Sequence, residues 1–369
     1  RLMSWTEHYS ALDRAVHRIA FGGIGLQKAV ADIEDRVFAR RFADVTVDRP
    51  VFITSLPRAG TTLLLELIAD LPEFAAHTYR HMPFLLCPMF WNDISKGFQQ
   101  KTTKRARAHD DGVIIDCDSV EAFEEALWQA WWPGNYRDGH IRLWGAGDEH
   151  PEFEAFFANH LRKIVALGRD KDAGLAARYV SKNNDNIARI PYLAKLFPDC
   201  RIVVPVRGPL AHVKSLHRQH TRFLGAHAED AFARDYMRAI GHREFGENLM
   251  PIAFPGFDGN ANDATDPAFW LEYWISAFSM LAALDLPQVR FVSFEDLVER
   301  PRPVLDGLLR WLEAGEPAAC ERLAGRITRP SSERRDDAKL NLALAPERLA
   351  VADELHAALI TRERQRRVA

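Results

Sequence analysis

The sequence predicts an α/β protein in which helices cover both faces of a central parallel sheet. Two observations predict this fold class. Segments with strand composition, such as 178–181, 201–207 and 289–293, alternate along the chain with longer segments of helical periodicity. The first strand-like run, 51–53, contains only β-branched and aromatic residues, as a buried strand requires. We therefore expect a three-layer fold with helical additions around the sheet.

The composition is that of a globular protein. The 369 residues could form one large domain or two smaller ones, and 47% apolar with 27% charged residues are ordinary values. A net charge of -3 argues against a nucleic-acid partner, and no signal peptide or membrane-spanning apolar run is visible. The cysteines lie far apart without a CxxC pair, which favours reduced thiols and a cytoplasmic location: Cys87, Cys117, Cys200 and Cys320.

We expect three regions along the chain. Apolar residues recur at helical spacing within residues 1–45, which predicts a helical N-terminal arm. It could brace the core, which is the default, contact a partner or cover a substrate pocket. Residues 46–325 would form the α/β core, with a charged and then Gly/Asn/Pro-rich insertion at about 224–266. Residues 326–369 are polar and basic at first and then helical, and we expect them to close the ligand site.

The first half of the core continues from the strand at 51–53 into a helix that opens at Thr61. A second strand at about 75–79 would end beside the first, so its following loop would open at the same edge of the sheet. A short strand at 113–115 and helices at 119–132 and 152–167 follow. The first of these helices carries aromatic residues whose spacing is typical of core packing, with a ligand pocket as the alternative: Trp128, Trp131 and Trp132.

The second half begins with the strand at 178–181, which leads to Lys182. The strand at 201–207 contains Pro205, which donates no ladder hydrogen bond and is therefore unusual in a central strand. The remaining expected elements are helices at 187–197, 210–223 (opened by Pro209), 267–284 and 303–312, and a strand at 289–293.

The turn at 56–60 directs backbone N–H groups and the positive end of the next helix at one spot, which is a binding site for phosphate-like anions. It differs from a Walker A loop, which has Gly, four residues and then Gly-Lys-Ser/Thr. Ser55 stands at the first Gly position and Thr61 at the Lys position, while Thr62 fits the final hydroxyl. The cation has moved to Arg58. The turn predicts an anion site without the usual ATP and Mg²⁺ arrangement.

Two motifs resemble those of one enzyme family. The segment Pro57-Arg58-Ala59-Gly60-Thr61-Thr62 resembles the 5′-phosphosulfate loop of sulfotransferases that use 3′-phosphoadenosine 5′-phosphosulfate (PAPS). Arg207 ends a strand, Pro209 opens a helix, and Ser215 follows eight residues after the arginine. This spacing is similar to the 3′-phosphate motif of the same family, in which a guanidinium and a hydroxyl share a phosphate dianion.

The resemblance implies a P-loop-like α/β fold and transfer of a sulfuryl group from PAPS to a hydroxyl or amine. Lys182 matches a lysine of the protein-tyrosine and related branches, where it could bind a sulfuryl or bridging oxygen. The closing motif of the cytosolic aryl branch does not occur, and the segment 326–332 resembles the other branch, in which Ser331 would reach the cofactor phosphates. No metal is required in principle, because Arg58, Lys182 and loop N–H groups can stabilise the charge.

A general base must take the proton of the acceptor. In the family that the sequence resembles, this base is a His or Glu near the segment after the second strand, and His81 fits this position best. His77 and Glu125 are the alternatives. His77 and His81 could instead bind a metal, but no third ligand is evident in the sequence.

Two other functions remain open at this point. One is a P-loop kinase or NTPase, which Thr61 at the lysine position disfavours. The other is a non-catalytic nucleotide-binding protein of the same fold. If the protein is a sulfotransferase, its acceptor could be a small molecule, a glycan, a lipid or a peptide. The sequence does not determine the oligomeric state.

Overall fold

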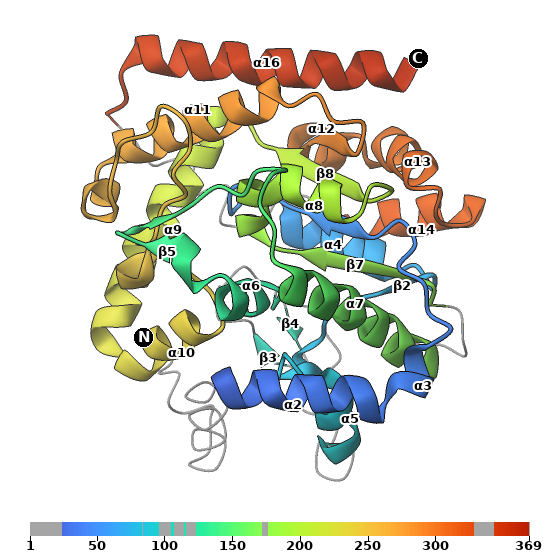
Figure 1. Ribbon diagram of the computed structural model, residues 1–369. Helices are drawn as coiled ribbons and strands as arrows, with labels where there is room; N and C mark the ends of the chain where they lie inside the picture. The colour runs from blue at the N-terminus through green and yellow to red at the C-terminus, as the bar shows by residue number, and fades with distance from the viewer. Residues whose placement is uncertain are drawn as a thin grey trace.

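Five parallel strands form the central sheet of the computed structural model, in the order β2-β7-β1-β8-β9 (Figure 1). The α/β class with a central parallel sheet is therefore confirmed. β1 lies at the centre of the sheet, so the loop that follows it opens at the middle of the carboxyl edge. The strands are β1 Val51–Ile53, β2 Phe74–Ala75, β7 Arg178–Lys182, β8 Arg201–Val206 and β9 Val289–Ser293. The structure describes residues 24–82, 84–95, 105–106, 114–115, 123–171, 176–327 and 343–368.

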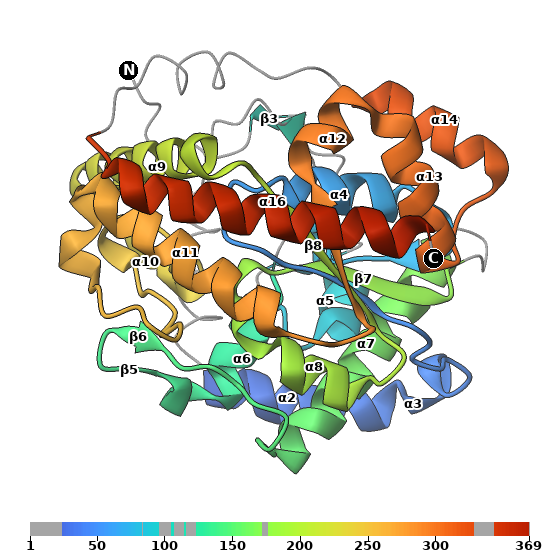
Figure 2. The same ribbon diagram turned by 90° about the horizontal axis from the view of Figure 1, so that it is seen from above.

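Helices cover both faces of the sheet and create two hydrophobic cores (Figures 1 and 2). Val51 and Ile53 lie in the smaller core with α4 and α12 to α14, whereas Phe52 lies in the larger core with α7 to α9, α11 and α16. This division follows from the pleat, because successive side chains of a strand point to opposite faces. These helices are α4 Thr61–Ala69, α7 Pro151–Lys171, α8 Ile190–Leu196, α9 Pro209–Glu229, α11 Pro267–Ala283, α12 Phe294–Glu299, α13 Pro301–Leu312, α14 Pro317–Arg326 and α16 Pro346–Val368.

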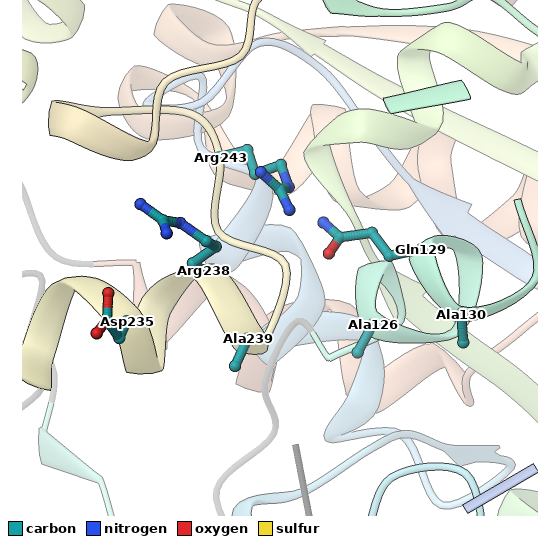
Figure 3. Close-up of a pocket in the computed structure, with 7 residues that line it drawn as sticks. All are labelled: Ala126, Gln129, Ala130, Asp235, Arg238, Ala239 and Arg243. Carbon is teal, nitrogen blue, oxygen red and sulfur yellow. The ribbon is translucent and has the colours of Figure 1, made fainter. Parts of the chain in front are cut away.

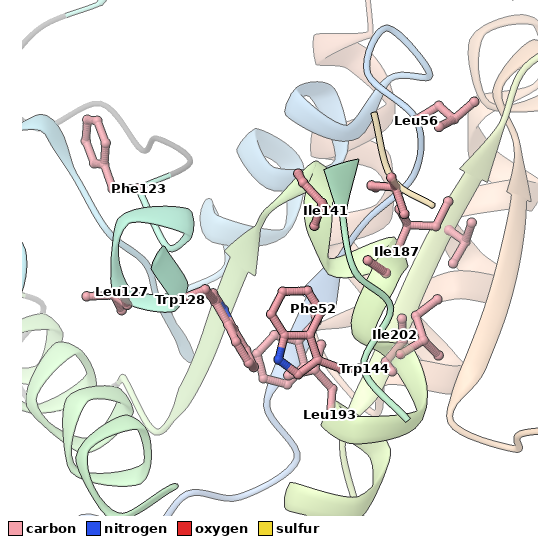
Figure 4. Packing of buried hydrophobic residues seen from close by; sticks show 14 of the residues in the cluster. Phe52, Leu56, Phe123, Leu127, Trp128, Ile141, Trp144, Ile187, Leu193 and Ile202 are labelled. Atoms are coloured by element: carbon pink, nitrogen blue, oxygen red, sulfur yellow. The ribbon is translucent and has the colours of Figure 1, made fainter. Parts of the chain in front are cut away.

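Of the three tryptophans predicted to pack in the core, Trp128 (Figure 4) and Trp131 do so, and Trp132 is partly buried against it. Trp128 and Trp131 are both buried in α6 Glu125–Trp131, within the helix expected at 119–132. The Trp128 ring meets that of Trp144 edge-on, with ring centroids 5.9 Å apart. Core packing is therefore confirmed as the role of these two rings.

The second strand is shorter than the sequence predicts. β2 ends at Ala75 rather than near Tyr79, and Tyr79–His81 form the 3-10 helix η2. A capping box explains the change, because the side chains of Thr78 and His81 each bond to a backbone N–H of the other residue. These local bonds replace the strand ladder in this segment.

Pro205 occurs in a central strand because its missing N–H is not needed there. β8 pairs with β1 only as far as Val203, and β1 then gives way to the loop. The Pro205 carbonyl points to the same side and accepts a hydrogen bond from Ser55 Oγ at 2.7 Å. The proline therefore lies beyond the last ladder bond on that side, and its pairing with Val292 on the other side continues.

α2 is fixed to the core by a buried ion pair. Lys163 Nζ of α7 lies 2.9 Å from Glu34 Oε1, and both side chains are fully buried. The division into three regions remains a prediction, since residues 1–23 and 328–342 lie outside the description. The structure's remaining described elements are α2 Ile24–Val37, α3 Ala39–Phe42, α5 Pro88–Ser95 and α10 Ala231–Ala239; the paired strands β3 Arg105–Ala106 with β4 Ile114–Ile115 and β5 Tyr136–Arg137 with β6 His140–Ile141; and the 3-10 helices η3 Pro133–Asn135, η4 Asn184–Arg189, η5 Gly246–Asn248 and η6 Ala261–Thr265.

A membrane-spanning helix would need to be both long and apolar, and none of the helices in the described part of the chain meets both conditions.

Candidate active site

The loop between β1 and α4 forms a backbone cradle at the centre of the sheet edge. Ser55 fixes the start of this loop through its bond to Pro205 O. Arg58 has a φ of 70° and Gly60 a φ of 98°, so the backbone reverses direction just before α4 begins. The first N–H groups of a helix have no partner within it, and the positive end of the helix dipole lies at the same place. The loop thus has the geometry of an anion site.

His212 of α9 holds the loop from the opposite side. Its Nε2 donates to Pro57 O at 2.7 Å, and its Nδ1 accepts from the indole N–H of Trp274 at 3.1 Å. Burial, followed by the charges of Arg207 and Arg58, lowers the pKa of His212 to about 3. The ring is therefore neutral at physiological pH and remains a donor to the loop carbonyl. No sequence motif marks this residue, and it was missed by the reasoning from sequence.

Gly60→Ala is expected to lower the free energy of unfolding by about 2–4 kcal/mol, measured by denaturant unfolding. A Cβ at Gly60 would lie 2.5 Å from Cδ2 of the Phe294 ring, and the φ of 98° is one that L side chains rarely adopt. Gly225→Ala is the matched control, because a Cβ there would meet nothing within 4 Å in the exposed part of α9. Gly225→Ala should be neutral or stabilise by up to about 1 kcal/mol. Equal destabilisation by the two variants would contradict the conclusion that the loop requires glycine at position 60.

The turn between β8 and α9 meets the β1–α4 loop. Arg207 Nη1 donates to Arg58 O at 3.1 Å, and Arg58 Nε donates to Ser215 Oγ of α9 at 3.4 Å. Arg207 and Ser215 are buried, and the Arg207 guanidinium lies 5.5 Å from the centre of the Phe294 ring. Two guanidinium groups and a hydroxyl thus lie together beside the loop. The side chain of Arg58 reaches the residue predicted for the second anion, so the two predicted motifs form one continuous surface.

The end of β7 lies beside the same loop. Lys182 is its last residue and is buried. Asn184 accepts a hydrogen bond from Thr61 Oγ1 at 3.1 Å and donates through Nδ2 to Glu244 Oε1 at 3.1 Å. Burial alone would raise the pKa of Glu244, but His242, Lys182 and Asn184 together lower it to about 2. An ionised carboxylate is therefore fixed close to the lysine at this strand end.

The two candidate histidines have different surroundings. His81 is buried, and its Nδ1 accepts the N–H of Thr78 at 3.1 Å, which leaves the proton of the neutral ring on Nε2. His77 Nε2 lies 2.9 Å from His160 Nε2. Burial, and then the charge of His81, places the pKa of His77 well below its usual range. His77 is thus a neutral core residue, whereas His81 stands at the end of η2, after β2.

Glu125, the third candidate base, is held by several donors. Tyr136 OH donates to Oε1 at 2.5 Å and Asn183 Nδ2 donates to Oε2 at 2.8 Å. The Arg189 guanidinium binds both carboxylate oxygens, at 2.7 and 3.2 Å. These four bonds engage both oxygens of the Glu125 carboxylate, which favours a structural role in the ion pair with Arg189.

The remaining predicted residues divide into described and undescribed ones. Ala59 is buried in the loop, and Thr62 is half-buried in the first turn of α4. Ser331 lies outside the described residues. Asp185 was not predicted, yet it lies buried just after β7, and burial followed by the charges of neighbouring carboxylates raises its pKa well above the usual range. Within the described ranges, no three His, Cys, Asp or Glu side chains are grouped so that they could hold a metal ion.

A model of the sulfotransferase family matches residues 50–257, which is more than half of the chain and includes the loop, Lys182 and the β8–α9 turn. The chain belongs to the sulfotransferase family. The resemblance noted in the sequence is thereby confirmed at the level of the family.

Comparison of this sulfotransferase with curated protein sequences finds no match. Solved structures to which it is similar include sulfotransferase STF1 from Mycobacterium tuberculosis H37Rv, with 16% identity and a TM-score of 0.48, covering 93% of this chain and 86% of that one. Sulfotransferase STF9 from Mycobacterium avium is 14% identical with a TM-score of 0.47, covering 89% and 81%. A sulfotransferase from Alicyclobacillus acidocaldarius is 14% identical with a TM-score of 0.37, covering 86% and 95%.

Proposed function

We propose that this sulfotransferase moves a sulfuryl group from PAPS to a hydroxyl or amine of an acceptor. The observation that carries the proposal is the contact between two anion-binding turns, in which Arg58 bonds to Ser215 and Arg207 bonds to the Arg58 carbonyl. Such a surface suits a nucleotide with anionic groups at both its 5′ and 3′ positions. Thr61, at the position of the Walker lysine, bonds to Asn184 and supplies no cation for an ATP γ-phosphate.

Each end of the nucleotide has its own binding residues in this proposal. The backbone N–H groups of residues 58–62 would bind the 5′-phosphosulfate. His212 fixes the start of this segment through its hydrogen bond to the Pro57 carbonyl. Arg207 and Ser215 would bind the 3′-phosphate. Ser331, beyond the described residues, remains proposed as a further phosphate ligand.

PAPS supplies the sulfuryl group. The acceptor oxygen or nitrogen forms a bond to sulfur while the bond from sulfur to the bridging phosphate oxygen breaks, and that oxygen keeps the electron pair as adenosine 3′,5′-bisphosphate leaves. Arg58 and Lys182 would stabilise the charge on the sulfuryl oxygens, which removes the need for a metal.

His81 is the proposed acceptor of the departing proton. In its neutral state the ring carries a proton on Nε2, and its Nδ1 lone pair is occupied by the Thr78 N–H. This bond must be exchanged before His81 can act as a base, and hydrogen bonds in catalytic sites commonly rearrange when substrate binds. Asp185 is the alternative at the end of β7, because burial raises its pKa and a carboxylate with a raised pKa is a stronger base.

A cytoplasmic location also stays a proposal. Cys87 and Cys200 are free and buried, and burial raises the pKa of each thiol to about 12. Such thiols are unreactive core residues and require no oxidising compartment.

Adenosine 3′,5′-bisphosphate is expected to stabilise the protein without Mg²⁺, by about 2.7 kcal/mol at a hundred times its Kd, in a thermal-shift titration. Arg207→Ala should remove the preference for the bisphosphate over adenosine 5′-phosphate, because the 3′-phosphate of the bisphosphate then loses its contact with the Arg207 guanidinium. Equal or greater stabilisation by Mg·ATP would instead favour a kinase or NTPase. Bisphosphate binding without transfer of labelled sulfate from PAPS to any acceptor would favour a non-catalytic nucleotide-binding protein.

A further inference from the structure

A cavity of about 420 Å³ lies between α6 and α10, next to the residues that support the end of β7 (Figure 3). Gln129 of α6, Arg238 of α10 and Arg243, which follows α10, line it together with Asp235 and several alanines. In Figure 3 the side chains of Arg243 and Gln129 point toward one another from opposite walls. The volume lies within the range of pockets that bind small molecules.

The polar atoms of this cavity are mainly donors that need an acceptor. Among the described residues, neither Nε of Arg243 nor Nε2 of Gln129 has a hydrogen-bond partner, although both atoms are buried. Arg238 is fixed by a bond from its Nε to Asn248 Oδ1 at 3.0 Å. Such unpartnered buried donors are rare in folded proteins, and they leave the walls of the cavity rich in donors.

Nearby carboxylates do not cancel the positive charge. Asp235 also lines the cavity, but its Oδ1 lies 3.3 Å from Arg234 Nε, which partly balances its charge. Glu125, at the start of α6, is paired with Arg189. Burial, followed by the charges of Glu125 and Glu244, raises the pKa of Asp185 well above its usual range and so disfavours its charged form. The cavity therefore favours an anionic ligand.

The cavity and the proposed transfer site share their supporting segments. Arg243 immediately precedes Glu244, whose carboxylate accepts from Asn184, the partner of Thr61 in the β1–α4 loop. Gly241, in the same segment, packs so closely on Glu125 that a Cβ would lie 2.8 Å from the Glu125 Cβ. The segment 241–244 thus connects the wall of the cavity to the residues at the carboxyl ends of β7 and β1.

We propose that this cavity binds the non-reacting end of the acceptor and that this end carries a carboxylate or a phosphate. The inference rests on the proposed sulfuryl transfer, because it assigns the acceptor side of that reaction. Arg243 and Arg238 bind the anionic oxygens, and Gln129 donates a further hydrogen bond. The hydroxyl or amine of the same molecule then faces Lys182 and the loop.

Phenyl phosphate is the probe for the first test, by calorimetric titration with and without saturating adenosine 3′,5′-bisphosphate. The bisphosphate blocks the nucleotide site, so phenyl phosphate that still binds must use another site. We expect its Kd to rise about tenfold or more in Arg243→Gln and Arg238→Gln, since each loses a charged hydrogen-bond donor. Arg238 is exposed, so its variant should fold normally even if Arg243→Gln does not.

Arg137→Gln is the matched control, because it removes the same charge from the exposed β5–β6 hairpin that follows α6. Its Kd for phenyl phosphate should equal that of the unmodified protein. Absence of binding to the unmodified protein, or equal loss in the control, would overturn the assignment. If phenyl phosphate binds but the bisphosphate does not, the proposed reaction is contradicted and the anion pocket stands. If the bisphosphate binds but phenyl phosphate does not, only the pocket is contradicted.

The second test uses turnover. 4-Hydroxyphenylacetate and its amide differ only in the anionic group and are offered as acceptors with labelled PAPS. The carboxylate should have the lower KM, and Arg243→Gln should raise that KM about tenfold while kcat stays within about threefold, as expected for uniform binding. Preference for the amide, or a fall in kcat with an unchanged KM, would contradict the proposed role.

Discussion

His81→Ala is expected to lower kcat for sulfuryl transfer by about 10²–10⁴-fold, because that is the range contributed by a general base. Binding of adenosine 3′,5′-bisphosphate should remain within about threefold, since the bonds that hold the loop come from His212 and Ser55. The loss of the Thr78 bond should lower the free energy of unfolding by only about 1 kcal/mol. Steady-state kinetics, bisphosphate titration and denaturant unfolding measure the three quantities separately.

His77→Gln separates catalysis from packing. His77 is buried against His160, so its replacement should affect stability while kcat of the folded fraction stays near that of the unmodified enzyme. Normal turnover by His81→Ala would move the base elsewhere, and Asp185→Asn would then be the next variant to measure. A raised pKa predicts that a base at Asp185 gives an activity that rises with pH through a higher range than an ordinary aspartate would.

The two anion-binding turns could be predicted from the sequence because each one is local. The loop at 56–60 needs a strand, a turn with Gly60 at positive φ and a helix, and all three lie within a few residues. Arg207 and Ser215 likewise share one strand–helix junction. Alternation of such units also predicts a parallel sheet, since parallel strands require crossover connections. This is why the fold class was predictable without knowledge of long-range contacts.

The residues that sequence reasoning missed act through distant partners. His212 bonds to Pro57, 155 positions earlier, and Glu244 receives its bond from Asn184, 60 positions earlier. No spacing along the chain marks such pairs, because only the folded sheet brings their segments together. The shortened β2 has a different cause, since its sequence fits a strand and the local bonds of Thr78 and His81 outweigh that preference.

Glu125→Ala is expected to lower the free energy of unfolding by about 3–5 kcal/mol, because it leaves a buried guanidinium without its partner. Arg189 is fully buried and its guanidinium contacts two indole rings, 4.4 Å from the Trp128 centroid and 4.3 Å from that of Trp144. Burial opposes the charge of Arg189, but Glu125 and Tyr136 outweigh this effect and raise its pKa. Denaturant unfolding measures the loss.

Asp306→Ala is the exposed control for this pair. It breaks the contact between Arg310 and Asp306, which are four residues apart on α13 and largely exposed, so the change should stay below about 1 kcal/mol. The double variant Glu125→Leu/Arg189→Met should be more stable than Glu125→Ala, because it removes both buried charges. Equal destabilisation by the exposed and the buried substitution would contradict this account of the pair.

The same variants decide whether Glu125 is structural or catalytic. Glu125 Oε2 holds Asn183 Nδ2 at 2.8 Å, and Asn183 is the residue after Lys182, so the ion pair supports the end of β7. Glu125→Gln keeps the shape and one acceptor oxygen. If Glu125 is structural, this variant should lose stability while kcat of the folded protein falls less than tenfold. If it were the base, kcat of Glu125→Gln would fall by about 10²-fold or more. The double variant Glu125→Leu/Arg189→Met would then be more stable than Glu125→Ala but equally inactive.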